Sequence, residues 1–142
     1  MKIGIINGPN LNLLGQREPD VYGKERFENF MDQLSLNFET HQFQYFQSNE
    51  EGALVNALHE MAETCQGIVL NPAAFTHTSL ALGDAVKGID IPLIEVHISN
   101  VYGRESFRHK SYVSPGALAV ISGFGLDSYR LAIEGLIEHL ST

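Results

Sequence analysis

Cysteine and basic residues are scarce in this 142-residue chain, and each scarcity excludes a class of protein. The one cysteine, Cys65, permits no intramolecular disulfide, which fits a reducing compartment. It falls on the apolar side of a predicted helix, which favours a buried core residue over a nucleophile. Nine Lys and Arg residues against 17 Asp and Glu residues give a net charge of −8. Because nucleic-acid-binding proteins carry a basic face, we expect no nucleic-acid partner.

Long apolar runs are also missing. No stretch of about 18 apolar residues is present to span a bilayer, so we expect no membrane partner. The first residues lack the charged start, apolar middle and cleavage site of a signal peptide, since Lys2 is followed almost at once by a polar loop. These absences favour a soluble cytoplasmic protein.

The residues that are present predict a single globular domain over residues 1–142, with a hydrophobic content of 44%. Short apolar segments alternate with segments of helical spacing. We expect strands at Lys2–Asn7, Phe43–Gln47, Gly67–Asn71, Pro92–His97 and Ala117–Ser122. We expect helices over Phe27–Phe38, from Ser48 to Cys65, over Thr78–Lys87 with Gly88 ending it, and over Leu126–Leu140. Ser48 and Glu51 have capping-box spacing, whereas Ser99–Gly116 indicates only a short helix or an irregular loop.

Five apolar strands separated by helices predict an α/β protein whose parallel sheet is covered on both faces. The flavodoxin-like strand order 2-1-3-4-5 is the expected topology, giving a three-layer sandwich. Ligands of such sheets bind beyond the carboxyl ends of the strands, near the switch point between the first and third strands. The segments that follow Asn7, Asn71 and His97 are therefore where a site is expected.

Polar residues do gather at these strand ends. The first strand is followed by Asn10, Arg17 and Tyr22, and the third ends in Asn71 and leads to His77. The fourth contains Glu95 and His97 and is followed by Ile98, Ser99 and Arg108. Taken singly, each residue has a plainer interpretation. Tyr22 could pack within its loop, Arg17 could be a surface charge, and Asn10 could stabilise a turn. His77 could cap a helix, His97 could be a core histidine, and Asp84 in the third helix could lie on an exposed face or at a subunit contact. Their joint placement favours an active site.

Several kinds of site are excluded by what these segments do not contain. The first strand is followed by neither a dinucleotide-binding nor a P-loop glycine pattern. Asn7 and Asn71 stand where a receiver domain would need acids. The histidines at 77, 97 and 109 show no zinc-ligand spacing, and none of the four lysines ends a strand. We therefore expect no metal and no cofactor, but acid–base chemistry on a small polar substrate.

Three long motifs carry a family resemblance: INGPNLNLLGQREPDVYG, NPAAFTHTSLALGDAV and PLIEVHISNVYGRESFRHKSY. Together they resemble type II 3-dehydroquinate dehydratase, nearly end to end and in the same order. The resemblance implies a flavodoxin-like fold, a homododecamer built as a tetramer of trimers, and no cofactor. It implies the conversion of 3-dehydroquinate to 3-dehydroshikimate and water, a reaction of both the shikimate pathway to aromatic amino acids and quinate breakdown.

The resemblance also implies roles for five catalytic residues. Tyr22 resembles the base, a phenolate that removes the C2 proton. Lowering a phenol pKa by two units requires roughly 2.7 kcal/mol, which a close arginine, here Arg17, would supply. Asn10 matches the position that stabilises the enolate, through a water. His97 resembles the acid that protonates the leaving C1 hydroxyl in an anti elimination, oriented by Glu95 on the same face of the strand.

The other site residues resemble substrate-binding positions of the family. Ile98 and Ser99 would offer backbone N–H groups to the substrate carboxylate, and Asn71, His77 and Arg108 would contact its hydroxyls. Asp84 resembles the residue that reaches a neighbouring subunit's site.

The sequence departs from the family pattern at three positions. Gly83 stands where arginine is common, Phe75 where tyrosine is common and Gly103 where alanine is common. Gly83 is expected to cost about 1 kcal/mol of helix stability and to alter the trimer interface. The sixteen-residue connection after the first strand predicts a lid, with weaker order over roughly Leu14–Gly23.

Two alternatives stay open on the residues alone. One is a non-catalytic flavodoxin-like module that binds a small acid or a partner protein. The other is a hydro-lyase of the same architecture that acts on a different hydroxy-acid.

Overall fold

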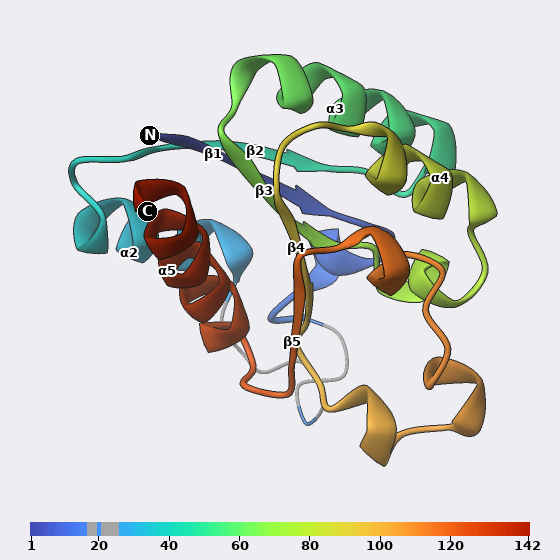
Figure 1. Cartoon of the computed structure of the whole chain (residues 1–142). Helices are drawn as coiled ribbons and strands as arrows, with labels where there is room; N and C mark the ends of the chain where they lie inside the picture. Colours follow the sequence, from blue (N-terminus) through green and yellow to red (C-terminus); the bar gives the residue numbers. More distant parts are fainter. Residues whose placement is uncertain (17–19, 21–25) are drawn as a thin grey trace.

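The computed structural model describes residues 1–16, 20 and 26–142. Its sheet has five parallel strands in the order β2-β1-β3-β4-β5, as expected (Figure 1). The strands are β1 Lys2–Asn7, β2 Gln42–Gln47, β3 Gly67–Asn71, β4 Leu93–His97 and β5 Ala119–Ser122. The main helices are α2 Phe27–Asn37, α3 Glu51–Thr64, α4 Leu80–Gly88 and α5 Asp127–Ser141. None of the described helices is long and apolar enough to cross a membrane.

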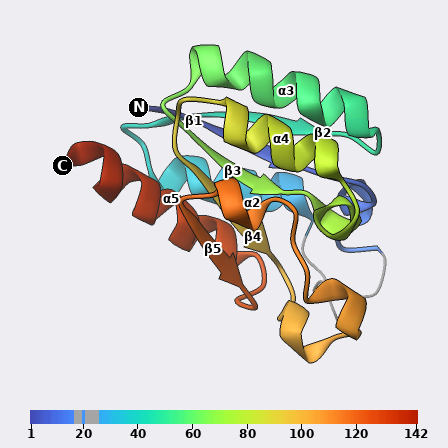
Figure 2. The same ribbon diagram turned by 45° about the vertical axis from the view of Figure 1, so that its right-hand side comes forward.

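The molecule has three layers, with helices on both faces of the sheet (Figure 2). Successive strand residues point to opposite faces, so each strand contributes to two cores. Ile3 and Ile5 of β1 pack with the buried residues of α2 and α5. Ile6 packs on the other face with α3 and α4. Because helices cover both faces, β3 and β4 are buried along their whole length.

Two predicted helix starts are wrong in detail, whereas one predicted helix end is confirmed. Ser48 does not form a capping box, because its hydroxyl accepts a hydrogen bond from the backbone N–H of Glu50 at 3.0 Å and α3 begins only at Glu51. The last residue of α4 is Gly88, as predicted, and its φ is not positive. Ser79 begins that helix, since its hydroxyl accepts from Leu82 N at 2.9 Å. The alternative interpretation of His77 as the cap is therefore also wrong.

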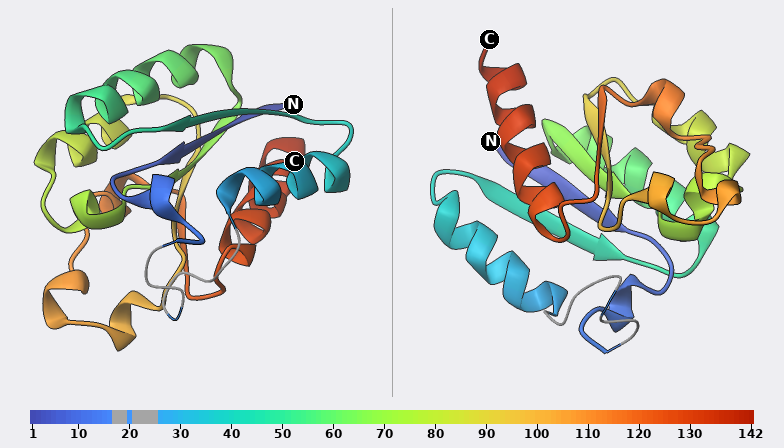
Figure 3. Two further views of the ribbon diagram at one scale, coloured as in Figure 1. Left: turned by 180° about the vertical axis from the view of Figure 1, so that it is seen from behind. Right: turned by 90° about the horizontal axis from the view of Figure 1, so that it is seen from below.

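The segment between β4 and β5 is irregular, as expected, and contains three short 3-10 helices. These are η3 Val101–Gly103, η4 Ser106–Arg108 and η5 Ser114–Gly116. The first two lie beyond the carboxyl end of the sheet, at the same end of the molecule as η1, Leu11–Leu13, which follows β1 (Figure 3). Residues far apart in sequence thus surround one end of the sheet.

At the switch point β1 and β3 end side by side, with Asn7 paired to Asn71 in the ladder. The loops that leave them run close together. A Cβ on Gly8 would lie 2.5 Å from the carbonyl oxygen of Pro72, so only glycine permits this approach. From β2, Gln47 donates to the Gly8 carbonyl at 3.1 Å and holds the loop after β1 in place.

Candidate active site

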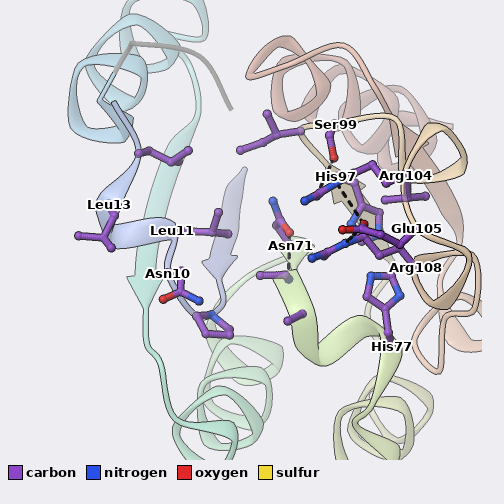
Figure 4. A pocket seen from close by; sticks show the side chains of 16 residues that line it. Asn10, Leu11, Leu13, Asn71, His77, His97, Ser99, Arg104, Glu105 and Arg108 are labelled. Carbon is purple, nitrogen blue, oxygen red and sulfur yellow. Dashed lines mark hydrogen bonds and ion pairs between the residues drawn. The ribbon is translucent and has the colours of Figure 1, made fainter. Parts of the chain in front are cut away.

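An open cavity of about 170 Å³ lies at this end of the sheet and is lined by the segments that follow β1, β3 and β4. Figure 4 shows Asn10, Leu11 and Leu13 on one side of it and the residues carried by β4 and the segment after it on the other, with Asn71 between. The cavity occupies the position expected for a ligand of a doubly wound sheet.

Glu95 and His97 form an ion pair on one face of β4. His97 Nε2 lies 2.5 Å from Glu95 Oε2, and the imidazole is 6% exposed while the glutamate is 1% exposed. Alternation along the strand places both side chains on the same face, as the sequence predicts. The imidazole lines the cavity, and the carboxylate lies behind it and is not among the lining residues. His97 is thus a buried, satisfied histidine that still reaches the site.

Two serines that sequence reasoning missed complete the surroundings of Glu95. Ser111 and Ser114 donate hydroxyl hydrogen bonds to its Oε1 at 2.9 and 2.8 Å. Burial alone would raise the pKa of Glu95, but hydrogen bonds from His97 and both serines outweigh it and hold the pKa below its usual value. The carboxylate is therefore ionised at neutral pH and accepts the N–H of His97.

His77 faces the same region from the loop after β3. Its Nδ1–H donates to the carbonyl oxygen of Lys110 at 2.7 Å, which leaves Nε2 as an acceptor in the neutral ring. Burial lowers the pKa of His77, so the neutral form is favoured. Its ring stacks near that of His97, with centroids 6.3 Å apart and planes inclined by 20°.

Ile98 and Ser99 follow β4 along the cavity wall. Within the part of the chain that the structure describes, neither backbone N–H donates a hydrogen bond. The Ser99 hydroxyl accepts from Arg104 Nη1 at 3.2 Å, and Ser122 donates to the Ser99 carbonyl at 2.9 Å. Adjacent N–H groups beside a guanidinium suit a carboxylate ligand.

Two arginines from the segment after β4 line the cavity together with one carboxylate. Arg108 was predicted, whereas Arg104 was not, because neither its position after a strand nor the family motif marked it as a site residue. Arg108 Nε lies 2.8 Å from Glu105 Oε2, and Arg104 Nε lies 3.9 Å from the same oxygen. Among the described lining residues, two arginines outweigh one glutamate although the whole chain is acidic, and this balance favours an anionic ligand.

Asn10 and Asn71 lie on the cavity wall at the ends of the first and third strands. Asn10 adopts the left-handed conformation, with φ 70°, and its backbone N–H donates to Asn49 Oδ1 at 2.9 Å. Its side chain makes no capping bond in η1, so it does not stabilise this turn through its side chain, although the left-handed conformation itself favours asparagine. Asn71 is buried, and its Oδ1 accepts from Ala73 N at 3.0 Å.

Three further predicted site residues are not among the described residues that line the cavity. Asp84 lies exposed on α4 and does not line the cavity of its own chain. Arg17 and Tyr22, with most of the predicted lid, lie outside the described residues. Among the residues the structure does describe, no group of three His, Cys, Asp or Glu side chains is arranged to hold a metal ion.

Comparison with known proteins gives consistent matches over the whole length. A sequence model of the family described as dehydroquinase class II matches residues 1–137. A 3-dehydroquinate dehydratase of Prochlorococcus marinus (strain MIT 9313) is 51% identical over 142 residues, covering 99% of this chain and 95% of the relative. One of Shewanella oneidensis is 50% identical, covering 99% and 97%. The crystal structure of a type II dehydroquinase from Butyrivibrio crossotus superposes with a TM-score of 0.92 at 44% identity, covering 96% and 97%.

The fold and the cavity define a flavodoxin-like α/β protein whose acid–base residues lie at the carboxyl end of its sheet. Within that class, the matches to the family model, the relatives and the crystal structure identify the family. The chain belongs to the dehydroquinase class II family.

Proposed function

We propose that this chain is a 3-dehydroquinate dehydratase, a lyase that eliminates water from 3-dehydroquinate to form 3-dehydroshikimate. Family membership supports the reaction, and relatives at about half identity carry that name. The observation that carries the proposal is the Glu95–His97 pair, because it presents a proton-donating imidazole to the cavity of a chain in this family. No metal, cofactor or covalent intermediate enters the proposed chemistry.

The proposed elimination moves two protons. Tyr22, as a phenolate activated by Arg17, removes the C2 proton, and the electron pair of that bond forms the enolate of the C3 ketone. Asn10 stabilises the enolate oxygen through a water. The enolate then re-forms the ketone and expels the C1 hydroxyl, which takes a proton from His97 and leaves as water. The proton held by Tyr22 afterwards restores His97, so the enzyme returns to its starting state.

The geometry of His97 supports its assignment as the acid. Since Nε2 bonds to Glu95, Nδ1 is the nitrogen left to exchange a proton with a ligand. An ionised carboxylate behind the ring stabilises the imidazolium that must donate. Glu95 therefore orients the acid and does not itself contact the substrate.

Binding is proposed to use the opposite charges of substrate and cavity wall. The backbone N–H groups of Ile98 and Ser99 receive the substrate carboxylate, with Arg104 alongside. Arg108, His77 and Asn71 contact the ring hydroxyls. His77 accepts from a hydroxyl through Nε2, because its Nδ1 is already engaged by Lys110.

The assembly and the location of the enzyme are also proposals. We propose a homododecamer of four trimers, in which the exposed Asp84 reaches the site of a neighbouring subunit. We propose a cytoplasmic location, which suits a chain whose single cysteine is a buried free thiol.

The experiment that tests the function follows the ultraviolet absorbance of the conjugated enone. Purified protein, treated with EDTA and with borohydride, is expected to turn over 3-dehydroquinate. Tyr22→Phe and Arg17→Ala are expected to lose most of that turnover while still folding. Tyr102→Phe is the matched control, because this exposed hydroxyl does not line the cavity, and it should keep full activity.

Each contrary result has a distinct meaning. Retained activity in Tyr22→Phe would overturn the base assignment. Binding of 3-dehydroquinate without turnover by the unmodified protein would identify a non-catalytic module. Turnover of another hydroxy-acid in a substrate panel, with none of 3-dehydroquinate, would identify a different hydro-lyase.

A further inference from the structure

A chain of buried hydrogen bonds runs beneath the cavity and has no part in the chemistry described so far. Its centre is Tyr129 of α5, which is 0% exposed. The Tyr129 hydroxyl donates to Asn7 Oδ1 at 2.6 Å and accepts from Asn71 Nδ2 at 2.9 Å. Asn7 Nδ2 in turn donates to the Tyr45 hydroxyl at 3.3 Å. One hydroxyl therefore joins the ends of β1 and β3 at the switch point.

These bonds determine how the Asn71 amide is oriented. Its Oδ1 accepts from Ala73 N, so the oxygen faces the loop after β3, where Ala73 adopts a positive φ of 53°. Its Nδ2 gives one N–H to Tyr129. A primary amide has two N–H donors, so among the described residues one is left without an acceptor. Because Asn71 lines the cavity, that N–H is the donor it can offer to a ligand.

Tyrosine is suited to this position for two reasons. Its hydroxyl donates once and accepts, so it can bond an amide oxygen and an amide nitrogen at the same time. Burial raises the pKa of Tyr129 far above its usual value, so the hydroxyl keeps its proton. Its ring is held by Phe27 and Phe30 of α2, with centroids 4.9 and 5.9 Å away. The two helices on this face of the sheet thus hold the hydroxyl in place.

We propose that Tyr129 is a positioning residue for substrate binding, fixing the Asn71 amide so that its remaining N–H donates to a ring hydroxyl of the substrate. This inference rests on the proposed function. Ring hydroxyls that take no part in the elimination are bound alike in the ground state and the transition state. Loss of such a contact raises KM and leaves kcat unchanged.

The variant Tyr129→Phe removes only the hydroxyl and keeps the ring. We expect KM for 3-dehydroquinate to rise about tenfold, since one hydrogen bond to a substrate oxygen is lost or misdirected, and kcat to stay within about twofold. The matched control is Tyr45→Phe, which removes the hydroxyl at the other end of the chain of bonds. That hydroxyl is bonded to Asn7 and not to Asn71. It should leave KM unchanged. An unchanged KM in Tyr129→Phe would overturn the proposal.

A double-mutant cycle separates positioning from general stability. If Tyr129 acts through Asn71, then adding Tyr129→Phe to an Asn71→Ala variant should change kcat/KM no further. A purely structural role for the hydroxyl would lower thermal stability in both backgrounds and leave the two effects on kcat/KM independent. Independent effects would therefore also overturn the proposal.

A spectroscopic measurement keeps the test valid if Tyr129→Phe does not fold. In ¹⁵N-labelled unmodified protein, the side-chain amide signals of Asn71 are assigned by their loss in Asn71→Ala. Saturation with 3-dehydroshikimate should shift the signal of one Asn71 amide proton strongly and that of its partner, bonded to Tyr129, little. Equal or absent shifts would contradict the inference. Absence of turnover in the unmodified protein would instead count against the proposed function itself.

Discussion

Glu95 shows how single residues prepare this site. Burial to 1% exposure raises the pKa of a carboxyl group, but three hydrogen bonds to the Glu95 carboxylate hold its pKa below the usual value. Two of the three donors, Ser111 and Ser114, come from the segment that follows β4. An ionised Glu95 is what allows His97 to be held with Nε2 as donor. The proposed acid therefore depends on residues that do not line the cavity.

The contribution of these serines depends on pH with a definite sign. The pKa of Glu95 is lower in the folded state than in the unfolded chain, so its bonds stabilise the fold above about pH 4.5 and less as the pH falls through the folded-state pKa. We expect Ser114→Ala to lower the free energy of unfolding by about 1.5–3 kcal/mol at pH 7, as for a hydrogen bond to a charged group. Denaturant titrations from pH 3 to pH 7 should show that difference shrinking in acid.

The comparison variant is Ser106→Ala, which removes an exposed hydroxyl from the same segment and should have no such effect. A Ser114→Ala difference that stays constant down to pH 3 would show that the hydroxyl does not act through the Glu95 charge.

At the scale of elements, the site depends on how closely the segment after β4 packs against α4. Gly83 is buried in α4, and a Cβ there would lie 2.4 Å from the carbonyl oxygen of Tyr112. The Tyr112 N–H donates to the Thr76 carbonyl at 2.9 Å, which ties the same segment to the loop after β3. The glycine that the sequence marks as a cost to helix stability is also what permits this contact. The two serines on Glu95 flank Tyr112.

We expect Gly83→Ala to destabilise the protein by about 1–3 kcal/mol through overpacking, although alanine favours a helix by about 1 kcal/mol. Gly52→Ala in α3 is the matched control, since a Cβ there meets nothing within 4 Å. The control should be as stable as the unmodified chain or more stable. Chemical denaturation measures both, and a stabilised Gly83→Ala would show that the Tyr112 segment moves aside without cost.

At the scale of the whole molecule, several large apolar side chains are exposed on the isolated chain. They include Leu80 at the start of α4, Tyr102 and Phe107 beyond β4, and Phe124 after β5. Apolar groups of this size commonly mark surfaces covered by other subunits. Together with family membership, they support the proposed oligomer.

Light scattering on the purified protein should give the mass of a dodecamer of the 15.7-kDa chain. The role of Asp84 is tested by mixing two inactive variants, Tyr22→Phe and Asp84→Ala, and letting the subunits exchange. If Asp84 serves a neighbouring site, some mixed sites contain both intact residues and activity returns. If the mixture stays inactive although mixed oligomers form, Asp84 has no role across the interface.

Element order, strand positions and several of the residues that line the candidate cavity could be predicted because their determinants are local. Apolar runs and helical spacing define the elements, and the adjacent strands β1 and β3 were predicted with their observed bounds. The ion pair of Glu95 and His97 follows from alternation along one strand. The capping box at Ser48 failed because its hydroxyl accepts from the N–H of Glu50, one residue before Glu51, and this depends on how the chain enters α3.

The sequence by itself determined the sheet, its switch point and the strand ends at which the cavity lies. Only the tertiary structure decided which groups support them. Ser111 and Ser114 reach Glu95, and Tyr129 joins Asn7 to Asn71, through contacts set by strand register and helix docking. Nothing in the local pattern of these three residues distinguishes them from an ordinary loop serine or a core tyrosine. A hydrogen bond requires its two atoms to lie within about 3 Å, and packing, not spacing along the chain, brings them there.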